Sequence, residues 1–322
     1  MPTCPICSQL LVTLIKRRDK YTLLQCKSCS FITSEPLPTS EELARYYAGS
    51  LFNKPEPHQE KERERVIDKD VRIIIADMEV PAGGVGKSLL DCGGGTGHYA
   101  AAFARHGFLV TFIDLDPAAC NYVQEKNSGQ FKVVEGDALK YNFKEKFDFI
   151  FCNQLIEHYP DPNQLIKHLK KNLSLEGIII LTTPNQNSKE FYFRPKWSLS
   201  YIYMATGWKL HKVPKAIFTF LKKPWICCDP PRHLHSFNPK NLTMLLEKNG
   251  FTVIKLFTEY STSQHYSLRK YRDFSFHSLR DILKIILNIY ALAGVCFLRR
   301  WDRNNKRGSN LVAYAKNVKF NL

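Results

Sequence analysis

The sequence lacks a hydrophobic run long enough to cross a lipid bilayer. In the apolar segment 278–300, the uncharged part Ile285–Leu298 has 14 residues, whereas a spanning helix needs ~20. The chain also opens Met-Pro-Thr-Cys-Pro, without the basic start and apolar core of a signal peptide. We therefore expect a cytoplasmic protein whose ten cysteines are metal ligands or core residues and not disulfides.

Acidic residues are scarce in the second half of the chain. Residues 186–322 carry 24 lysines and arginines against 7 aspartates and glutamates, a net charge of +17, whereas residues 1–185 carry 22 against 23. A basic segment attracts acidic partners. We therefore expect any anionic partner to be bound by the second half.

The glycine-rich part of the chain lacks two common phosphate-binding signatures. His98 stands where a G-x-G-x-x-G dinucleotide loop needs its third glycine. Pro81 stands where a P-loop at Gly83–Ser88 would need its first glycine, and that segment precedes a predicted strand instead of following it. These two absences argue against a dinucleotide and against a nucleoside triphosphate.

What this part of the chain contains is the pattern D-x-G-x-G-x-G at Asp91–Gly97. It joins a predicted strand, Lys87–Cys92, to a predicted helix, Gly97–His106, and the next predicted strand, Phe108–Ile113, is followed by Asp114. Glycine lets a ligand approach the backbone, and a carboxylate at the tip of a strand can accept hydrogen bonds from both ribose hydroxyls. The pattern predicts a nucleoside site; a tight turn without a ligand is the alternative.

The acid-led triple-glycine loop followed by Asp114 resembles the first motif of class I S-adenosylmethionine (SAM) methyltransferases. The resemblance implies a doubly wound, seven-stranded, Rossmann-like α/β sheet and SAM as the cofactor. It also implies that Asp137 binds the adenine amino group and that the backbone of Ala138 meets the ring; the alternative for Asp137 is an ordinary acid in the turn after a strand. The full predicted set of cofactor contacts is Asp91, Gly93, Gly95, Gly97, Asp114, Leu115, Asp137, Ala138 and Asn153.

The rest of the chain alternates strands and helices, as a doubly wound sheet requires. We predict helices at Pro117–Lys126 and Pro162–Leu173, and strands at Phe131–Val134, Phe147–Cys152, Gly177–Thr182, Phe251–Phe257 and Asn310–Lys316.

Two C-x-x-C pairs, Cys4–Cys7 and Cys26–Cys29, predict a structural zinc site. Each pair fits a tight turn, and the residues between them are long enough for a β-hairpin. Four cysteines leave no open coordination position, and a segment this small needs a metal to fold.

The predicted domain boundaries follow from these patterns. We expect a zinc ribbon at residues 1–34, a helical linker at 35–80 that packs on the core, and a methyltransferase domain at 81–322 with insertions at 191–228 and 260–308. In the linker, Ser40 is the predicted cap of a short helix. A second predicted helix, His58–Val80, begins with the charge run EKERER, which is typical of a solvated face.

Three residues are candidates for catalysis. Glu157 and His158 match the family's pair after the fourth strand, and a histidine can accept a proton near neutral pH. The alternative is that the pair closes the site and binds backbone. His233 occupies the family's histidine position and is a second candidate base. A second zinc site would need His233 together with His235, Cys227 and Cys228, and their spacing matches no common zinc-ligand pattern.

Two segments fall outside the predicted core. The first, Phe191–Trp225, is aromatic and basic, and it is the expected substrate cover. The second, residues 278–307, combines an apolar helix with five basic residues. It suits a helix on an anionic membrane surface at the inner face of the membrane, and it suits equally a helix buried against another subunit.

The zinc ribbon followed by the segment P-x-P-[ST]-x-E-E-L at Pro36–Leu43 resembles the N-terminus of a bacterial subgroup of SAM methyltransferases, many of which act on sugars or other small metabolites. The leading hypothesis is therefore methyl transfer from SAM to a sugar, a nucleotide-sugar or a lipid-linked intermediate. An RNA base methyltransferase with a zinc-ribbon RNA-binding module is the alternative, although no N-P-P-[YF] motif follows the fourth strand. A SAM-binding or zinc-adaptor protein without catalysis is the third hypothesis.

Overall fold

The computed structural model describes residues 2–17, 19–48, 57–79, 84–193, 227–260, 279–301 and 307–317, together with residues 211 and 214. Most of the predicted substrate cover Phe191–Trp225 lies outside the described residues, including its aromatic residues Trp197, Tyr201, Tyr203, Trp208 and Trp225. The chain divides into two compact units of discontinuous segments. One contains Met1–Leu37, Thr183–Leu242 and Phe257–Val312, and the other contains Pro38–Thr182, Thr243–Leu256 and Ala313–Leu322.

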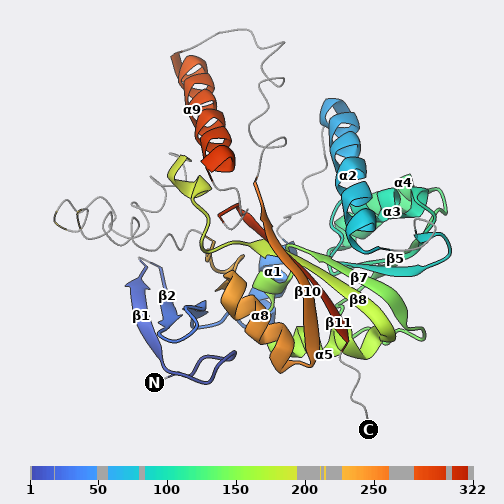
Figure 1. The fold of residues 1–322 in the computed structure, drawn as a ribbon, viewed down its shortest axis with the longest axis horizontal. Helices are drawn as coiled ribbons and strands as arrows, with labels where there is room; N and C mark the ends of the chain where they lie inside the picture. Colours follow the sequence, from blue (N-terminus) through green and yellow to red (C-terminus); the bar gives the residue numbers. More distant parts are fainter. Residues whose placement is uncertain are drawn as a thin grey trace. The chain divides into compact units, whose positions relative to one another are not determined.

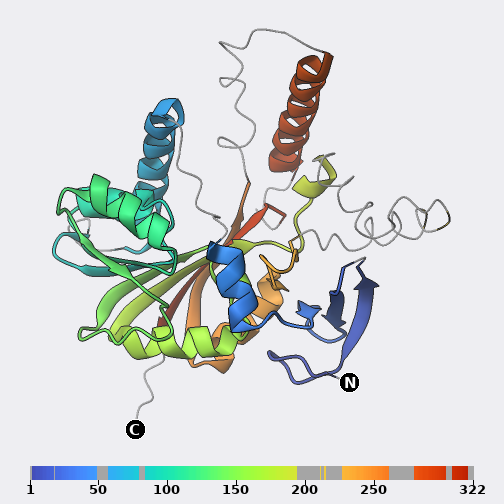
Figure 2. The same cartoon turned by 180° about the vertical axis from the view of Figure 1, so that it is seen from behind.

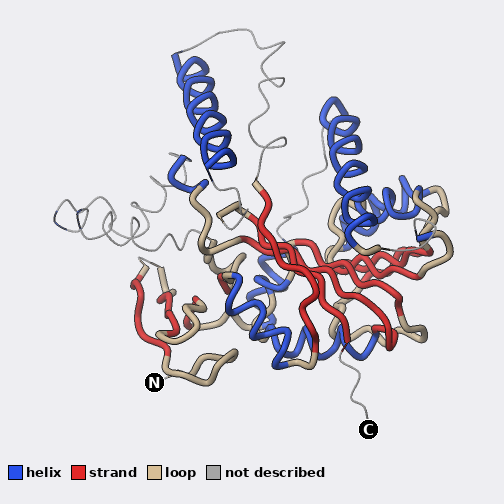
Figure 3. Tube along the Cα trace, viewed as in Figure 1, coloured by secondary structure: helices blue, strands red, loops and turns tan. Residues whose placement is uncertain are grey.

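The larger sheet has seven strands, which confirms the predicted number (Figures 1 and 3). Their order across the sheet is β10-β11-β8-β7-β4-β5-β6. The bounds are β4 (Ser88–Cys92), β5 (Leu109–Asp114), β6 (Lys132–Glu135), β7 (Phe147–Asn153), β8 (Leu173–Pro184), β10 (Phe251–Glu259) and β11 (Asn310–Asn317).

The central strands are apolar because helices cover both faces of such a sheet. Leu89, Leu90, Ile150, Ile179 and Ile180 are all fully buried. From β4 the chain moves outward through β5 to β6, and it then returns so that β7 pairs with the other side of β4. This reversal is a topological switch point, and ligands of α/β proteins bind beside the carboxyl ends of the strands there.

The helices lie where the sequence pattern predicts them, within a few residues. They are α1 (Ser40–Ala48), α2 (Pro57–Asp77), α3 (His98–Arg105), α4 (Pro117–Asn127), α5 (Pro162–Asn172), α8 (Pro239–Lys248) and α9 (Leu279–Trp301), with short 3-10 turns η2 (Ile156–His158) and η3 (Glu190–Phe193). Helices α3 and α4 pack against β5 and β6 (Figure 2).

Side-chain caps explain where several of these helices begin. Asp116 and Asp161 accept hydrogen bonds from the first backbone N–H groups of α4 and α5, and each is followed by proline. The predicted cap of α1 was wrong by one residue. The hydroxyl of Thr39 accepts from the N–H of Glu42, while the Glu42 carboxylate accepts from the N–H of Thr39, so Thr39 is the N-cap.

The smaller sheet has the order β1-β2-β3-β9. The predicted hairpin is confirmed as β1 (Leu11–Lys16) and β2 (Thr22–Cys26), and β3 (Ile32–Glu35) extends it. The fourth strand, β9 (His235–Ser236), comes from two hundred residues further along the chain and was not predicted. Its His235 side chain lies 3.0 Å from the buried hydroxyl of Thr33.

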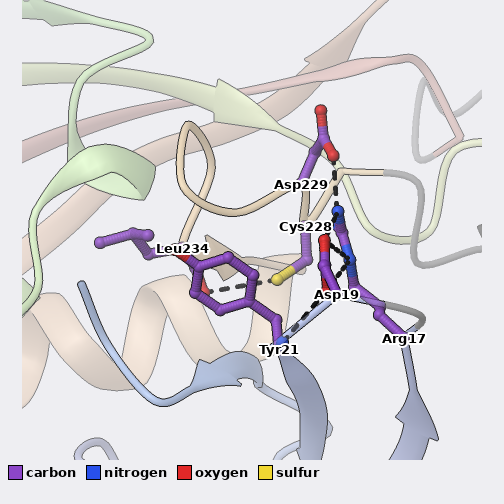
Figure 4. A network of polar contacts seen from close by, with 6 residues as sticks. All are labelled: Arg17, Asp19, Tyr21, Cys228, Asp229 and Leu234. Atoms are coloured by element: carbon purple, nitrogen blue, oxygen red, sulfur yellow. Dashed lines mark hydrogen bonds and ion pairs between the residues drawn. The ribbon is translucent and has the colours of Figure 1, made fainter. Parts of the chain in front are cut away.

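A polar network joins the hairpin to the segment before β9 (Figure 4). The nearly buried guanidinium of Arg17 donates to Asp19 at 2.8 Å and to Asp229 at 3.2 Å. Beside it, the thiol of Cys228 donates to the carbonyl of Leu234. The smaller sheet and its polar network therefore include residues 229–236 as part of one folded unit with the N-terminal hairpin.

Candidate functional site

The glycine loop between β4 and α3 has three glycines in the left-handed region, with φ of 70° at Gly93, 56° at Gly95 and 70° at Gly97. A Cβ at Gly93 would come within 2.6 Å of Leu155, and one at Gly97 within 2.7 Å of Val123 on α4. A Cβ at Gly95 would meet nothing within 4 Å. Two of the glycines are thus required by packing, and Gly95 is the one that exposes backbone to open space.

Asp91 lies beneath this loop and is almost completely buried. Its Oδ2 atom has no hydrogen-bond partner among the described residues. Burial, and secondarily the nearby Asp114, raises the pKa of the Asp91 carboxyl to about 7. An unpaired buried carboxyl oxygen is costly, so a ligand that carries positive charge or donates a hydrogen bond to it would be favourable here.

Asp114 ends β5 beside the loop and is oriented by two backbone groups. Its Oδ2 accepts from the N–H of Gly95 at 2.8 Å, and its Oδ1 accepts from the N–H of Asp116 at 2.9 Å. Burial raises the pKa of this carboxyl. Each carboxylate oxygen has a second lone pair, so Asp114 can hold the loop and still accept hydrogen bonds from ribose hydroxyls. The side chain of the next residue, Leu115, is exposed.

The predicted adenine residues follow β6. Asp137 accepts from the N–H of Leu139 at 2.9 Å and from the hydroxyl of Tyr159 at 3.3 Å, and Ala138 is buried. Burial is the main cause that raises the pKa of Tyr159, so this phenol remains a neutral donor to Asp137. Tyr159 was missed by the sequence analysis, because a tyrosine in a loop carries no signal of its partner.

Asn153 ends β7, next to the switch point. Its side-chain oxygen accepts a hydrogen bond from the hydroxyl of Thr182 on β8. The following residue, Gln154, has φ of 55°, and its N–H donates to the carbonyl and hydroxyl oxygens of Thr182. The turn after β7 is therefore fixed by β8.

Glu157 and His158 lie in η2, directly after this turn. The Glu157 side chain is fully buried, and its Oε1 lies 4.0 Å from Nε2 of His158, whose side chain is 17% exposed. His233 belongs to the other compact unit, where its N–H donates to the carbonyl of Asp229, and its role as a base stays a prediction.

A second group of side chains surrounds the start of α3 and was not predicted. Glu60 of α2 accepts from the hydroxyl of Tyr122 at 2.9 Å and from the ammonium of Lys126, and it lies 3.2 Å from Nε2 of His98. Burial lowers the pKa of His98 in spite of this carboxylate. Glu60 is thus an exception to the solvated face expected of the charge run, and it fastens α2 beside the glycine loop.

The four N-terminal cysteines form a cluster whose sulfur atoms all lie within 4.8 Å of one another. The Cys4–Cys29 and Cys7–Cys26 sulfurs are 3.6 and 3.4 Å apart, close to the separation of about 3.8 Å in a tetrahedral Zn–S4 site. The donor set therefore fits zinc.

The two C-x-x-C turns have the same backbone geometry. The backbone carbonyls of Cys4 and Cys26 each accept from the N–H four residues later, and the residues after the second cysteine of each pair, Ser8 and Ser30, both have φ of 61°.

The thiols of Cys227 and Cys228 instead donate to backbone carbonyls. Within the described part of the chain they belong to no metal-ligand cluster, as their spacing indicated.

Comparison with known proteins gives one family match. A model described as "Methyltransferase domain" matches residues 59–256.

Curated relatives match a shorter stretch. The ubiquinone biosynthesis O-methyltransferase of Pseudomonas fluorescens (strain Pf0-1) is 32% identical over 113 residues, 34% of this chain and 49% of that protein. The enzyme of the same name from Pseudomonas entomophila (strain L48) is 32% identical over 111 residues, 33% of this chain and 48% of that protein. The chain thus spans about half the length of the curated relatives it matches.

Among solved structures, the 1,6-didemethyltoxoflavin-N1-methyltransferase of Burkholderia thailandensis superposes with a TM-score of 0.50 at 13% identity. The superposition covers 94% of this chain and 97% of that one. At this identity the similarity shows a shared fold and nothing further.

Proposed function

Since the chain belongs to the methyltransferase-domain family and is a SAM-dependent methyltransferase, we propose that its acceptor is a small molecule of the sugar, nucleotide-sugar or lipid-linked class. The curated relatives are O-methyltransferases by name, which favours a hydroxyl as the atom that receives the methyl group. We place the reaction in the cytoplasm.

The open space at Gly95 is the observation that carries the SAM site. A Cβ at Gly95 would meet nothing within 4 Å, and its N–H donates to the carboxylate of Asp114 at 2.8 Å. Asp91, at the end of the preceding strand, has a buried carboxyl oxygen without a hydrogen-bond partner among the described residues. We assign the ribose to Asp114, the adenine to Asp137 and Ala138, and the positively charged methionine portion to the loop above Asp91. Gly93, Gly97, Leu115 and Asn153 shape the walls of this site.

When bound, SAM supplies a methyl group on a positively charged sulfur, which an acceptor attacks in line. The protein aligns the two reactants and excludes water. His158 accepts the proton of the acceptor hydroxyl at Nε2, and buried Glu157 stabilises the resulting imidazolium. His233 is the alternative proton acceptor.

We also propose that Cys4, Cys7, Cys26 and Cys29 hold one structural zinc ion. The sulfur separations and the gathering of all four sulfur atoms within 4.8 Å of one another support this proposal. Elemental analysis of the purified protein should find one zinc per chain; a protein without zinc that is fully folded would contradict it.

Substitution of Asp114 by alanine tests the SAM site. Loss of its hydrogen bond to Gly95 and of the ribose contacts should weaken SAM binding at least about tenfold, or about 1.4 kcal/mol, in isothermal titration calorimetry. Glu135→Ala is the matched control, because Glu135 is an exposed acid at the end of the neighbouring strand β6. Equal SAM affinity in the two variants would refute the ribose assignment.

Transfer of a labelled methyl group from SAM tests the acceptor class. The protein is incubated with nucleotide-sugars, with a lipid extract and with total RNA, and the label in each fraction is measured. Label in the sugar or lipid fraction, lost in His158→Ala or His233→Ala but retained in the Glu135→Ala control, would support the proposal and identify the base.

The basic second half of the chain favours RNA as the alternative acceptor. Label found only in RNA, together with salt-dependent binding of RNA, would replace the small-molecule proposal by an RNA base methyltransferase.

A further inference from the structure

Helix α9 has one buried face with specified packing. Ala291, Val295 and Leu298 are buried, and Ala291 and Val295 pack with Tyr260 and Leu292. Phe193 of η3 lies so close to Gly294 that a Cβ there would come within 2.0 Å of its ring. This face fixes the rotation of the helix about its axis, so the side chains that point away from it are also fixed.

The opposite face of α9 is an exposed apolar stripe. It consists of large side chains at spacings of three, four and seven residues, each between 49% and 63% exposed: Ile286, Ile289, Tyr290, Phe297 and Trp301. Tyr290 is at the edge of the stripe, where its ring also contacts Phe193 with 5.7 Å between the ring centroids. Such spacings place side chains on one side of a helix. The stripe runs for about 22 Å, and a contiguous apolar surface of this kind marks an interaction site.

The charges around the stripe indicate what covers it. No aspartate or glutamate occurs between Lys284 and Trp301, and the sequence 299–307 carries five basic residues against the single acid Asp302, a net charge of +4: Arg299, Arg300, Arg303, Lys306 and Arg307. The guanidinium of Arg307 lies over the ring of Trp301, 4.7 Å from its centroid. A second copy of α9 would bring the same excess of basic residues to the interface, whereas anionic lipid would supply phosphates.

The dimensions of α9 also fit a surface-bound helix. No described helix has the length and apolarity needed to span a membrane. Tyrosine and tryptophan, which combine an apolar ring with a polar atom, favour the boundary between headgroups and acyl chains. We infer that α9 binds an anionic lipid surface, with the apolar stripe in the acyl boundary and the basic residues on headgroup phosphates.

Co-sedimentation of the full chain with vesicles tests this inference, without SAM present. We expect the protein to sediment with vesicles of phosphatidylcholine and phosphatidylglycerol, and much less with phosphatidylcholine alone. Raising the salt concentration should weaken binding, because it screens the basic residues. Because the assay contains no SAM or acceptor, its failure leaves the methyl-transfer proposal intact.

The test variant is Ile289→Gln with Phe297→Gln, and the matched control is Val85→Gln with Leu175→Gln. Val85 and Leu175 are 69% and 79% exposed and belong to the other compact unit. The stripe variant should lose at least about tenfold in partition coefficient, while the control should change less than about twofold. Both variants should unfold at the wild-type temperature, since they alter exposed side chains.

Three results would overturn the inference. The first is a wild-type chain that stays in the supernatant with anionic vesicles at low salt. The second is a stripe variant that sediments as well as the control. The third is a stripe variant that converts a wild-type dimer to a monomer in sedimentation velocity without loss of vesicle binding, which would identify a second copy as the partner.

Discussion

The side-chain amide of Asn241 donates a hydrogen bond to the backbone carbonyl of Cys29, with 3.3 Å between the two atoms. Asn238 donates to the same carbonyl at 3.2 Å, and the two asparagines also cap each other's backbone N–H groups at the start of α8. The cap of α8 and the second cysteine turn are therefore one buried hydrogen-bonded unit. We therefore expect the conformation of the second cysteine turn to depend on α8, and the stability of the start of α8 to depend on that turn.

Asn241→Ala should destabilise the protein by about 1–3 kcal/mol, because it removes a cap and leaves buried groups unpaired. The loss of stability should shrink when zinc is removed by a chelator, since the cysteine turn then no longer holds the Cys29 carbonyl in place.

Lys240→Ala is the control. The exposed ammonium of Lys240 donates to the carbonyl of Ser28 in the same turn, and its removal should cost less than about 0.5 kcal/mol. Chemical unfolding with and without zinc measures both effects. An equal loss in both metal states would show that the contact is not coupled to the metal.

The raised pKa of Asp91, about 7, predicts how stability depends on pH. The unfolded carboxyl has its ordinary pKa of about 4, so between these values the folded protein binds more protons than the unfolded chain. The free energy of unfolding of the SAM-free protein should therefore fall as pH rises from about 4 to about 7, and Asp114, whose pKa is also raised, should act in the same direction.

Asp91→Asn should flatten this pH dependence and make the SAM-free protein more stable at pH 8 by at least about 1 kcal/mol. The amide oxygen can still accept the backbone hydrogen bond from Ala100 that Asp91 accepts. Thermal unfolding at several pH values checks the slope, and calorimetry should show weaker SAM binding. A variant with the wild-type slope would exclude Asp91 as the titrating group.

Gly95→Ala and Gly97→Ala should differ in their main effect, which is weaker SAM binding for Gly95→Ala and lower stability for Gly97→Ala. A methyl at Gly97 meets Val123 at 2.7 Å, which should cost about 2–4 kcal/mol of stability together with the left-handed backbone. A methyl at Gly95 meets no protein atom within 4 Å, so it should cost only about 1–2 kcal/mol while it weakens SAM binding at least about tenfold. Melting temperature and calorimetry separate the two. If Gly95→Ala binds SAM normally, the open space beside it is not the cofactor site.

Ser30→Gly should stabilise the folded chain by about 0.5–1 kcal/mol, because Ser30 has φ of 61° and glycine adopts this region without steric cost. Ser28→Gly is the control. Ser28 is in the same turn but is not among the residues with positive φ, so glycine there should be neutral or destabilising. Equal effects of the two substitutions on the melting temperature would contradict the explanation.

Local features of the fold could be predicted from the sequence because they are encoded by neighbouring residues. The apolar run before Asp91, the glycine loop and the caps at Asp116 and Asp161 each act within a few positions of the chain. The two C-x-x-C pairs are of the same kind, since a tight turn brings each pair of sulfurs together. The cap of α1 failed by one position because Thr39 and Ser40 are equally suitable residues.

Long-range features were decided only by the tertiary structure. Nothing near Glu60 indicates that it would contact Lys126, and nothing near His235 indicates that it would pair with Thr33. Likewise, the sequence placed three glycines in a ligand loop, but only the positions of Leu155 and Val123 show that Gly95 alone faces open space. The sequence alone determined the order of the elements and the chemistry at their ends, because periodicity and turn residues are local. Which side chains meet, which are buried and which space stays open depend on the packing of distant segments, and this packing exists only in the folded chain.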